Sequence, residues 1–164
     1  MGDFLFKYID SIPELPQELI DEIINHDSTN LSVHRTHNYK KFRSSPNLKS
    51  WCNENIKGVV LVAIQEIHAN VGPHTDWGRD CAINYLVTTG NGKLCHYSSE
   101  TSMSFGKPNA KTYAPINGSK EISRVDIQPN RWHIINTEVL HGVVDITSVR
   151  LALTVNIDDY KNYI

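Results

Sequence analysis

Two polar residues, His74 and Asp76, stand two positions apart between a turn and an alternating apolar run, in the stretch ANVGPHTDWGRDCAINYLV (69–87). On a β-strand, side chains at i and i+2 project to the same face, so this imidazole and this carboxylate can reach one ion. Taken alone, the pair fits a polar strand end with a capping aspartate equally well. The motif therefore raises the question of a metal site without answering it.

A second stretch that bears on this question is RWHIINTEVLHGVVDITSVRLALTVNI (131–157). His141 begins one short apolar run and Arg150 begins the next, nine positions further on. A His-x-Asp pair with a distant histidine forms the two-histidine, one-carboxylate set that suits ferrous iron and leaves positions open for a co-substrate and oxygen. The planar, permanently charged guanidinium of Arg150 suits a second carboxylate, held some way from the metal.

The elements that must position these residues are mostly strands. From Gly58 onward the pattern changes to period two, and turn signals such as GNG (90–92) separate the apolar runs. We expect about eight strands and a mainly β sandwich or jelly roll, with His141 and Arg150 in opposite sheets facing the cavity between them. The clearest runs are 59–68, 81–89, 93–99, 121–127, 131–137, 141–146 and 149–157.

The remaining segments are predicted to be a helix and loops. Residues 13–28 place Leu15, Leu19, Ile23 and Ile24 on one side of an amphipathic helix, with Pro16 in its first turn. Residues 27–57 are expected to form loops, with a short helix or strand near Leu48–Trp51. Residues 104–120 are loop-like and are a candidate lid.

The composition is that of one globular domain, which we assign to residues 1–164. Hydrophobic residues make up 40% and charged residues 21%, and the net charge of -2 (pI ≈ 6.4) gives no strong attraction to nucleic acid or membrane. The cysteines (Cys52, Cys81, Cys95) are odd in number and form no CxxC pair, so no disulfide framework is expected. The N-terminus lacks the apolar core of a signal peptide. We expect a cytoplasmic protein.

The jelly-roll core, about 58–157, resembles the iron(II)/2-oxoglutarate-dependent dioxygenases, especially their prolyl-hydroxylase-like branch. The matching pieces are, in order, HTD with Arg79 shortly after it, NYL, GNGKL, PNRWHIIN, LHGV and RLALTVNI. The resemblance implies a double-stranded β-helix (jelly roll), on one sheet of which we expect the N-terminal helix to pack. This chain departs from many relatives in carrying GNGKLCHY where they have GGxT, and Ala152 where a family variant has serine.

The resemblance also implies a set of site residues. Iron would be held by His74, Asp76 and His141, and 2-oxoglutarate would chelate it with the distal carboxylate on Arg150. Tyr85 and Thr154 occupy the positions that assist this carboxylate in relatives, and period two puts Thr154 on the same face as Arg150. An aspartate at position 76 favours hydroxylation over halogenation.

The function implied is that of a hydroxylase that uses Fe(II), O2 and 2-oxoglutarate as co-substrate and releases succinate and CO2. The expected substrate is a prolyl- or asparaginyl-type peptide or amino acid. One alternative is a nucleobase demethylase of the same superfamily, although the acidic balance and the lack of a base-binding insertion count against nucleic acid. The other is a non-enzymatic, cupin-like jelly-roll binding module, in which Arg150 has no role.

Several further residues stay open between two interpretations. The basic segment 34–43 (HRTHNYKKFR) fits an anion-binding surface, but a solvated loop face is preferred. A second metal site at its two histidines lacks a partner motif. Trp77 and Arg79 are candidates for the cavity edge, or for packing and an ion pair respectively. Three histidines are expected to be strand residues without catalytic duty: His68, His96 and His133.

Overall fold

The computed structural model describes residues 4–29, 34–35, 38–100, 103–104 and 112–164. Its thirteen described strands are β1 (Phe6–Tyr8), β2 (His34–Arg35), β3 (Tyr39–Arg43), β4 (Val59–Ile67), β5 (Val71–His74), β6 (Cys81–Thr88), β7 (Lys93–Ser99), β8 (Met103–Ser104), β9 (Thr112–Tyr113), β10 (Ser119–Val125), β11 (Trp132–Asn136), β12 (His141–Val144) and β13 (Arg150–Ile157). The helical elements are α1 (Gln17–Ile24), α2 (Pro46–Asn55) and the 3₁₀ turns η1 (Ile116–Gly118) and η2 (Tyr160–Asn162).

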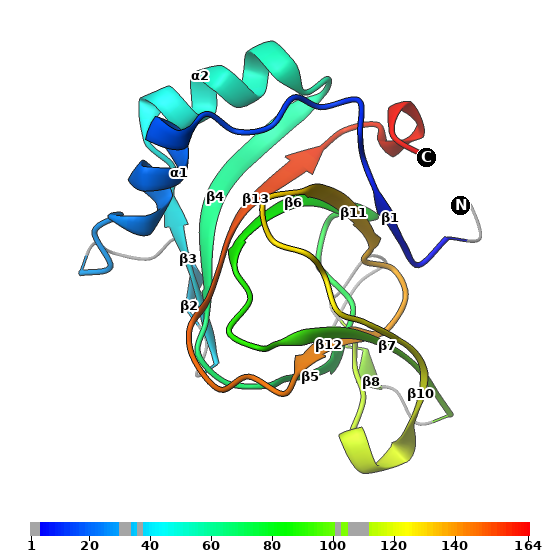
Figure 1. Ribbon diagram of the computed structural model, residues 1–164. Coiled ribbons are helices and arrows are strands. Elements are labelled where there is room, and N and C mark those ends of the chain that lie inside the picture. Colours follow the sequence, from blue (N-terminus) through cyan, green and yellow to red (C-terminus); the bar gives the residue numbers. More distant parts are fainter. Residues whose placement is uncertain (1–3, 30–33, 36–37, 101–102, 105–111) are drawn as a thin grey trace.

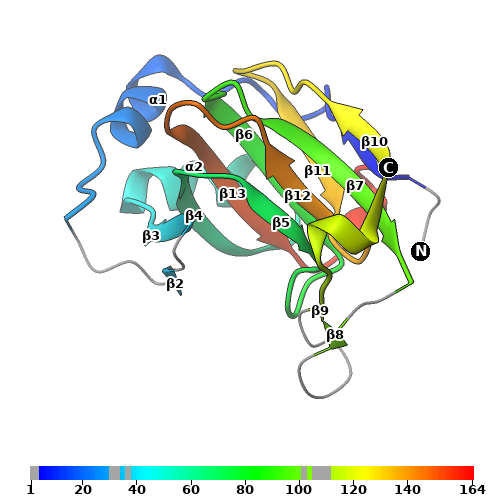
Figure 2. The ribbon, with the colours of Figure 1, turned by 90° about the horizontal axis from the view of Figure 1, so that it is seen from below.

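The strands form two facing sheets with antiparallel pairing (Figures 1 and 2). The seven-stranded sheet has the order β1-β11-β6-β13-β4-β3-β2, and the six-stranded sheet has the order β10-β7-β12-β5-β9-β8. Strands β4, β5, β6 and β7 alternate between the sheets, β8 to β10 stay in the six-stranded sheet, and β11, β12 and β13 alternate again, in the manner of a double-stranded β-helix. The mainly β jelly roll predicted from the sequence is confirmed, including the placement of the strands that begin at His141 and Arg150 in opposite sheets.

The two helices cover the outer face of the seven-stranded sheet (Figure 1). Helix α1 contacts β6 and β13 and is the predicted N-terminal helix, although it is shorter than 13–28. Helix α2 contacts β4 and lies where the sequence predicts only a short helix or strand within loops. It forms because Pro46 starts its first turn and the Ser45 hydroxyl accepts a hydrogen bond from the Leu48 N–H at 3.2 Å.

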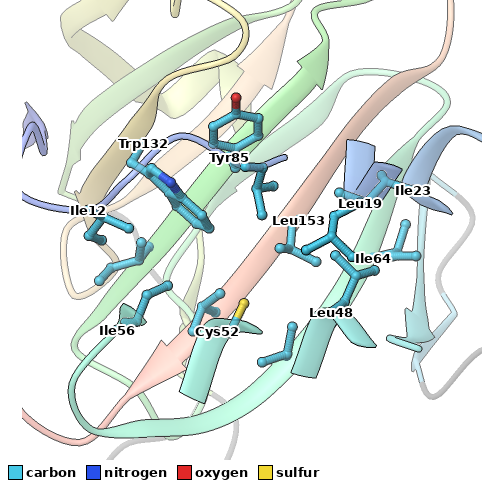
Figure 3. Packing of buried hydrophobic residues seen from close by; sticks show 14 of the residues in the cluster. Ile12, Leu19, Ile23, Leu48, Cys52, Ile56, Ile64, Tyr85, Trp132 and Leu153 are labelled. Carbon is cyan, nitrogen blue, oxygen red and sulfur yellow. The ribbon is translucent and has the colours of Figure 1, made fainter. Parts of the chain in front are cut away.

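The main hydrophobic core lies between these helices and the sheet. Figure 3 shows Trp132, Tyr85 and Leu153 on the sheet side, with Leu48 and Cys52 on the side of α2. The Trp132 indole N–H, which burial would otherwise leave without an acceptor, donates to the Pro13 carbonyl oxygen at 2.8 Å. The inner face of the same sheet carries both apolar side chains, such as Leu86, and polar ones, such as Asn84.

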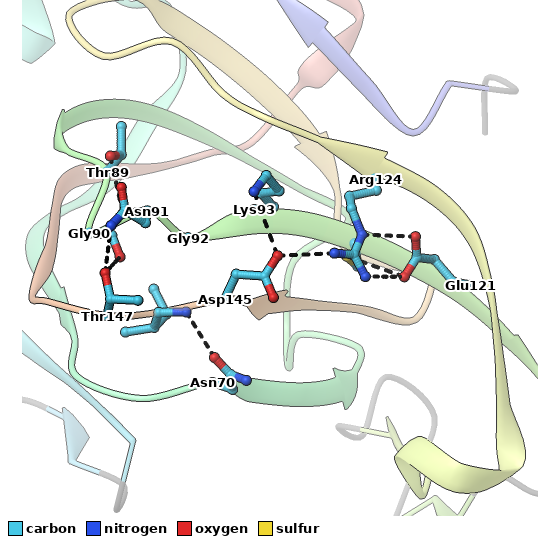
Figure 4. Close-up of polar contacts among 12 residues, drawn as sticks. Asn70, Thr89, Gly90, Asn91, Gly92, Lys93, Glu121, Arg124, Asp145 and Thr147 are labelled. Carbon is cyan, nitrogen blue, oxygen red and sulfur yellow. Dashed lines mark hydrogen bonds and ion pairs between the residues drawn. The ribbon is translucent and has the colours of Figure 1, made fainter.

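A polar corner joins the turn between β6 and β7 to the link between β12 and β13 (Figure 4). Gly90 has φ 55, and a Cβ at this position would lie 2.3 Å from the Ser148 carbonyl oxygen, so the corner requires glycine. The Thr147 N–H donates to the Gly90 carbonyl oxygen at 3.0 Å, and the Asn91 amide donates to the Thr147 hydroxyl at 2.6 Å. These contacts fix the start of β13, and therefore Arg150, against the start of β7.

Other expectations have mixed outcomes. Segment 104–120 is less irregular than predicted, because β9, η1 and the start of β10 lie in it; residues 105–111 of the candidate lid lie outside the described residues. All three cysteines are free and buried, as expected for a chain without a disulfide framework. No helix in the described part of the chain is long and apolar enough to cross a membrane.

Candidate metal centre

His74, Asp76 and His141 converge between the sheets, with one ligand atom from each lying within 4.8 Å of the others. His74 ends β5 and His141 begins β12, and the two residues face each other in the register of these neighbouring strands. The Asp76 Oδ1 atom lies 3.4 Å from the His74 Nε2 atom and 3.5 Å from the His141 Nε2 atom. We call these three residues the inner cluster.

Both histidines of the inner cluster are held in the tautomer that a metal needs. The Nδ1 atom of His74 lies 2.8 Å from the Gly72 carbonyl oxygen, and that of His141 lies 2.9 Å from the Val139 carbonyl oxygen. A carbonyl oxygen only accepts hydrogen bonds, so each Nδ1 carries the proton and each Nε2 keeps a lone pair directed at the cluster. Burial lowers the pKa of His74, which further favours the neutral, ligating form.

Arg79 holds the carboxylate of the inner cluster in one orientation. Its Nε atom donates to the Asp76 Oδ2 atom at 2.6 Å, and its Nη2 atom forms an ion pair with the same oxygen. Burial alone would raise the pKa of Asp76, but the positive charge of Arg79 holds it well below its ordinary value. Arg79 therefore forms an ion pair, which is one of the two roles that the sequence suggested for it. The Oδ1 atom of Asp76 is left to face both histidines.

Two residues that the sequence analysis missed support this arrangement. The Thr137 hydroxyl donates to the Arg79 carbonyl oxygen at 2.9 Å, and the Asp76 N–H donates to the Thr137 carbonyl oxygen at 3.0 Å. Asn156 accepts a hydrogen bond from Arg79 through its side-chain oxygen. These contacts link residues far apart in the sequence, so no local motif could have revealed them.

The inner cluster and Arg150 line one cavity, which also contains side chains from β3, β4, β6 and β11. The Arg150 side chain is buried, and its Nη1 atom donates to the Gly92 carbonyl oxygen at 2.8 Å. Burial lowers the pKa of Arg150 to about 10, which expresses the cost of holding this cation away from water. A guanidinium has five N–H donors, and the bond to Gly92 uses one of them among the described residues, so donors remain for an anion inside the cavity.

The prediction that Tyr85 faces the co-substrate is wrong. Tyr85 belongs to the outer hydrophobic core, with its ring centroid 4.9 Å from that of Trp132 (Figure 3). Its strand neighbours Asn84 and Leu86 line the cavity instead. The register explains the difference, because Tyr85 pairs with the core residue Leu153.

Thr154 lies on the cavity side of β13, as period two predicts, but it lies next to Arg79. Its hydroxyl accepts a hydrogen bond from the Arg79 Nη1 atom at 3.4 Å. Arg150, in contrast, bonds Gly92 at the start of β7. A role of Thr154 in holding a co-substrate carboxylate stays a prediction.

Other sequence candidates are placed as follows. Trp77 is 76% exposed, so it does not pack in the core. His133 lines the cavity and His96 is fully buried, with its ring centroid 6.3 Å from that of His141. Within the basic segment 34–43, Lys41 lies on β3, is partly buried and lines the cavity, while the anion-binding interpretation of this segment stays a prediction. Polar cavity residues that the sequence analysis did not name as site candidates include Gln65 and Asn84.

Comparison with known proteins supports the fold rather than an activity. No family model matches the chain, and no curated protein matches its sequence. Among solved structures, E. coli YcfD, elsewhere described as a ribosomal oxygenase, is 14% identical, with 97% of this chain and 48% of that chain covered and a TM-score of 0.50.

Two other structures illustrate the range of proteins that resemble this chain. The non-heme alpha-ketoglutarate-dependent epimerase SnoN, from nogalamycin biosynthesis, is 8% identical over 92% of this chain and 76% of its own, with a TM-score of 0.47. The vicilin from Solanum melongena is 13% identical over 80% of this chain and 31% of its own, with a TM-score of 0.46. The chain thus spans about half of YcfD and a third of the vicilin. At 8 to 14% identity, these likenesses concern the jelly-roll fold alone.

Proposed function

We propose that the protein is an Fe(II)- and 2-oxoglutarate-dependent dioxygenase that hydroxylates an unactivated C–H bond. The observation that carries this proposal is the presence of the inner cluster and the buried Arg150 in one cavity. The expected substrate type remains a prolyl- or asparaginyl-type peptide or amino acid. 2-Oxoglutarate, O2 and the substrate would give succinate, CO2 and the hydroxylated product.

The donor set fits a divalent iron ion. Two neutral imidazoles and one carboxylate form the facial triad typical of non-heme Fe(II) oxygenases. The backbone carbonyl partners of His74 and His141, and the Arg79 partner of Asp76, are the outer contacts that fix the orientation of such ligands. When bound, the iron supplies the oxygen chemistry.

The other residues bind and orient. Arg150 would receive the distal carboxylate of 2-oxoglutarate through its remaining donors, at the end of the cavity where Gly92 holds its guanidinium. The apolar side chains of Leu86 and Leu94 flank the same cavity and exclude water from the site of reaction.

Two alternatives are kept because each makes a distinct prediction. A nucleobase demethylase would use the same residues on a polymeric substrate. A cupin-like binding module accounts for the fold, but it does not require a buried cation in the cavity of the inner cluster, which costs free energy unless it serves a ligand. The second alternative predicts that the protein does not depend on 2-oxoglutarate and that Arg150 has no role in binding it.

The test is spectroscopic and does not need the substrate. Anaerobic addition of Fe(II) and 2-oxoglutarate is expected to give the visible charge-transfer band of the chelate. His74→Ala should abolish the band, and Arg150→Ala should raise the 2-oxoglutarate concentration needed for half-maximal intensity. A wild-type protein without the band, or a band unaffected by both substitutions, would exclude the dioxygenase.

A further inference from the structure

We propose that the substrate of this site is a small organic acid or phosphate ester, and that Lys41 binds its anionic group. This inference rests on the proposed function and specifies its substrate class. Lys41 belongs to the basic segment 34–43, which the proposed chemistry leaves without a role. Three features carry the inference: the distribution of charge along the chain, the position of Lys41 in the cavity, and its separation from Arg150.

The positive charge of the chain is concentrated in two segments. Residues 28–53 and 101–120 contain no Asp or Glu, yet they carry eight of the sixteen Lys and Arg residues of a chain whose net charge is -2. Described strands of these segments, β3 and β9, extend the two sheets next to β4 and β5, the strands joined by residues 68–70. Strands β3 and β9 therefore lie on one side of the sandwich, whereas Lys120 lies in β10 at the opposite edge of the six-stranded sheet. Strand β3 alone carries Lys40, Lys41 and Arg43, a local excess of positive charge that the net charge of the chain hides, and it is the local field that acts on a substrate.

Lys41 brings this charge into the cavity itself. It is partly buried, it lines the cavity, and it pairs across strands with Gln65, which also lines the cavity. Cationic side chains in the lining are Lys41, Arg79 and Arg150, and the carboxylate is that of Asp76. Since Arg79 and Asp76 are bound to each other, the lining carries a net positive charge before any metal is bound. A neutral or cationic substrate would not use this field.

Lys41 and Arg150 are placed to bind two different anionic groups. Strand β4 lies between β3 and β13, so the Cα atoms of Lys41 and Ala152 are about 10 Å apart across two strand spacings. Arg150 lies two residues before Ala152, on the same face of β13, and its guanidinium is held towards Gly92 at the start of β7. One dicarboxylate at Arg150 therefore lies in a different part of the cavity from Lys41, which lines it together with Tyr39 and Gln65.

The experiment measures succinate release after the iron–2-oxoglutarate band has been recorded for each variant. Probes are matched pairs that differ in one negative charge, L-proline against L-prolinamide and L-asparagine against L-asparaginamide. In addition, small molecules extracted from cells are separated by anion exchange into retained and unretained fractions. We expect stimulation by carboxylate-bearing probes or by retained compounds. For the compound that stimulates, Lys41→Met should raise KM at least tenfold, because a charge-assisted hydrogen bond is lost, and Lys41→Arg should restore part of it.

The matched control is Lys40→Met. Lys40 neighbours Lys41 on the same strand but pairs with Glu66, on the opposite face of the sheet, so this variant should leave KM unchanged. Stimulation only by unretained compounds, or equal KM values for the Lys41 and Lys40 variants, would overturn the proposal. So would a Lys41→Met effect on 2-oxoglutarate affinity alone, stimulation only by an oligonucleotide or polypeptide, or a normal band with no stimulation by any retained compound. These outcomes differ from failure of the proposed function, in which the band itself is absent.

Discussion

Two groups of two histidines and one carboxylate lie in different parts of this fold: the inner cluster, and an outer cluster of His26, Glu66 and His68. Both contain an i, i+2 pair on or beside a strand and one histidine from elsewhere in the chain. Both are largely buried, apart from His68, whose side chain is 36% exposed. By composition and spacing they are near equivalents, and only their geometry separates them.

In the outer cluster each histidine contacts a different oxygen of the carboxylate. The His26 Nε2 atom lies 2.6 Å from the Glu66 Oε1 atom, and the His68 Nε2 atom lies 2.7 Å from the Oε2 atom. The His26 Nδ1 atom lies 2.7 Å from the Ile23 carbonyl oxygen and therefore donates to it. The outer cluster ties the end of α1 to β4.

The difference teaches that neighbouring residues, rather than the motif, decide whether such a group can take a metal. In the inner cluster Arg79 occupies one Asp76 oxygen, so the other faces both histidines. In the outer cluster both oxygens of Glu66 are already taken. Among the described residues, the inner cluster is the one group of three such side chains whose ligand atoms lie close enough together to hold one ion.

The largest expected effect compares a histidine from each cluster. His74→Ala should weaken Fe(II) binding more than about 100-fold, because losing a ligand costs more than losing an outer contact. His68→Ala should leave the affinity unchanged. Anaerobic calorimetric titration measures both. Equal weakening by the two substitutions would break the comparison.

Removing Arg79, whose contact with Asp76 distinguishes the inner cluster from the outer cluster, should have the next largest effect. Arg79→Met frees the second oxygen of Asp76, and we expect Fe(II) affinity to fall about 10–100-fold. Arg79→Lys should recover part of the loss, since it restores the charge but not the fork-shaped contact. Arg131→Met, which removes a surface ion pair with Asp10, is the control for loss of an arginine. An Arg79→Met protein with wild-type affinity would show that Asp76 is oriented by other contacts.

The outer cluster should contribute to stability instead of binding. Glu66→Gln leaves two histidines without their carboxylate, and the free energy of unfolding in urea at pH 6 should fall by about 1–2 kcal/mol. In a double-mutant cycle with His26→Gln, the two effects should not be additive. Additive effects, or a parallel loss of Fe(II) affinity, would contradict the assignment.

His133 belongs to neither cluster, so it tests the effect of burial on the pKa of a histidine outside the two carboxylate clusters. Burial, assisted by the Arg150 charge, lowers its pKa to about 3. The folded protein therefore keeps His133 neutral while the unfolded chain takes up a proton near pH 6.5, so stability is lost as pH falls from about 6.5 towards 3. His133→Gln should reduce the loss of unfolding free energy between pH 7 and 5.5 by about 1 kcal/mol. An unchanged pH profile would show that His133 is not held neutral in the folded state.

Much of the fold follows from patterns that are local in the sequence. Strands β6, β7 and β13 begin within one residue of the predicted positions, because turn residues separate apolar runs of period two. The length of helix α2 is underestimated from the sequence, because its mean hydropathy is low and its apolar face is narrow. Its buried residues Leu48 and Cys52 attach it to the sheet. The same sequence patterns select His74, Asp76, His141 and Arg150, whose side chains then meet in one cavity.

The sequence by itself therefore determined which residues share a face of a strand, and the tertiary structure decided which face that is. Every residue from Cys81 to Leu86 is buried, so alternation could not place Tyr85, and only the pairing with Leu153 turned it to the core. Likewise, a histidine–carboxylate pair two residues apart occurs in both clusters. The contacts of each carboxylate leave one pair open to a metal and the other closed, because they fix where its oxygens point: Arg79 binds one oxygen of Asp76, whereas the distant His26 and the neighbouring His68 take both oxygens of Glu66.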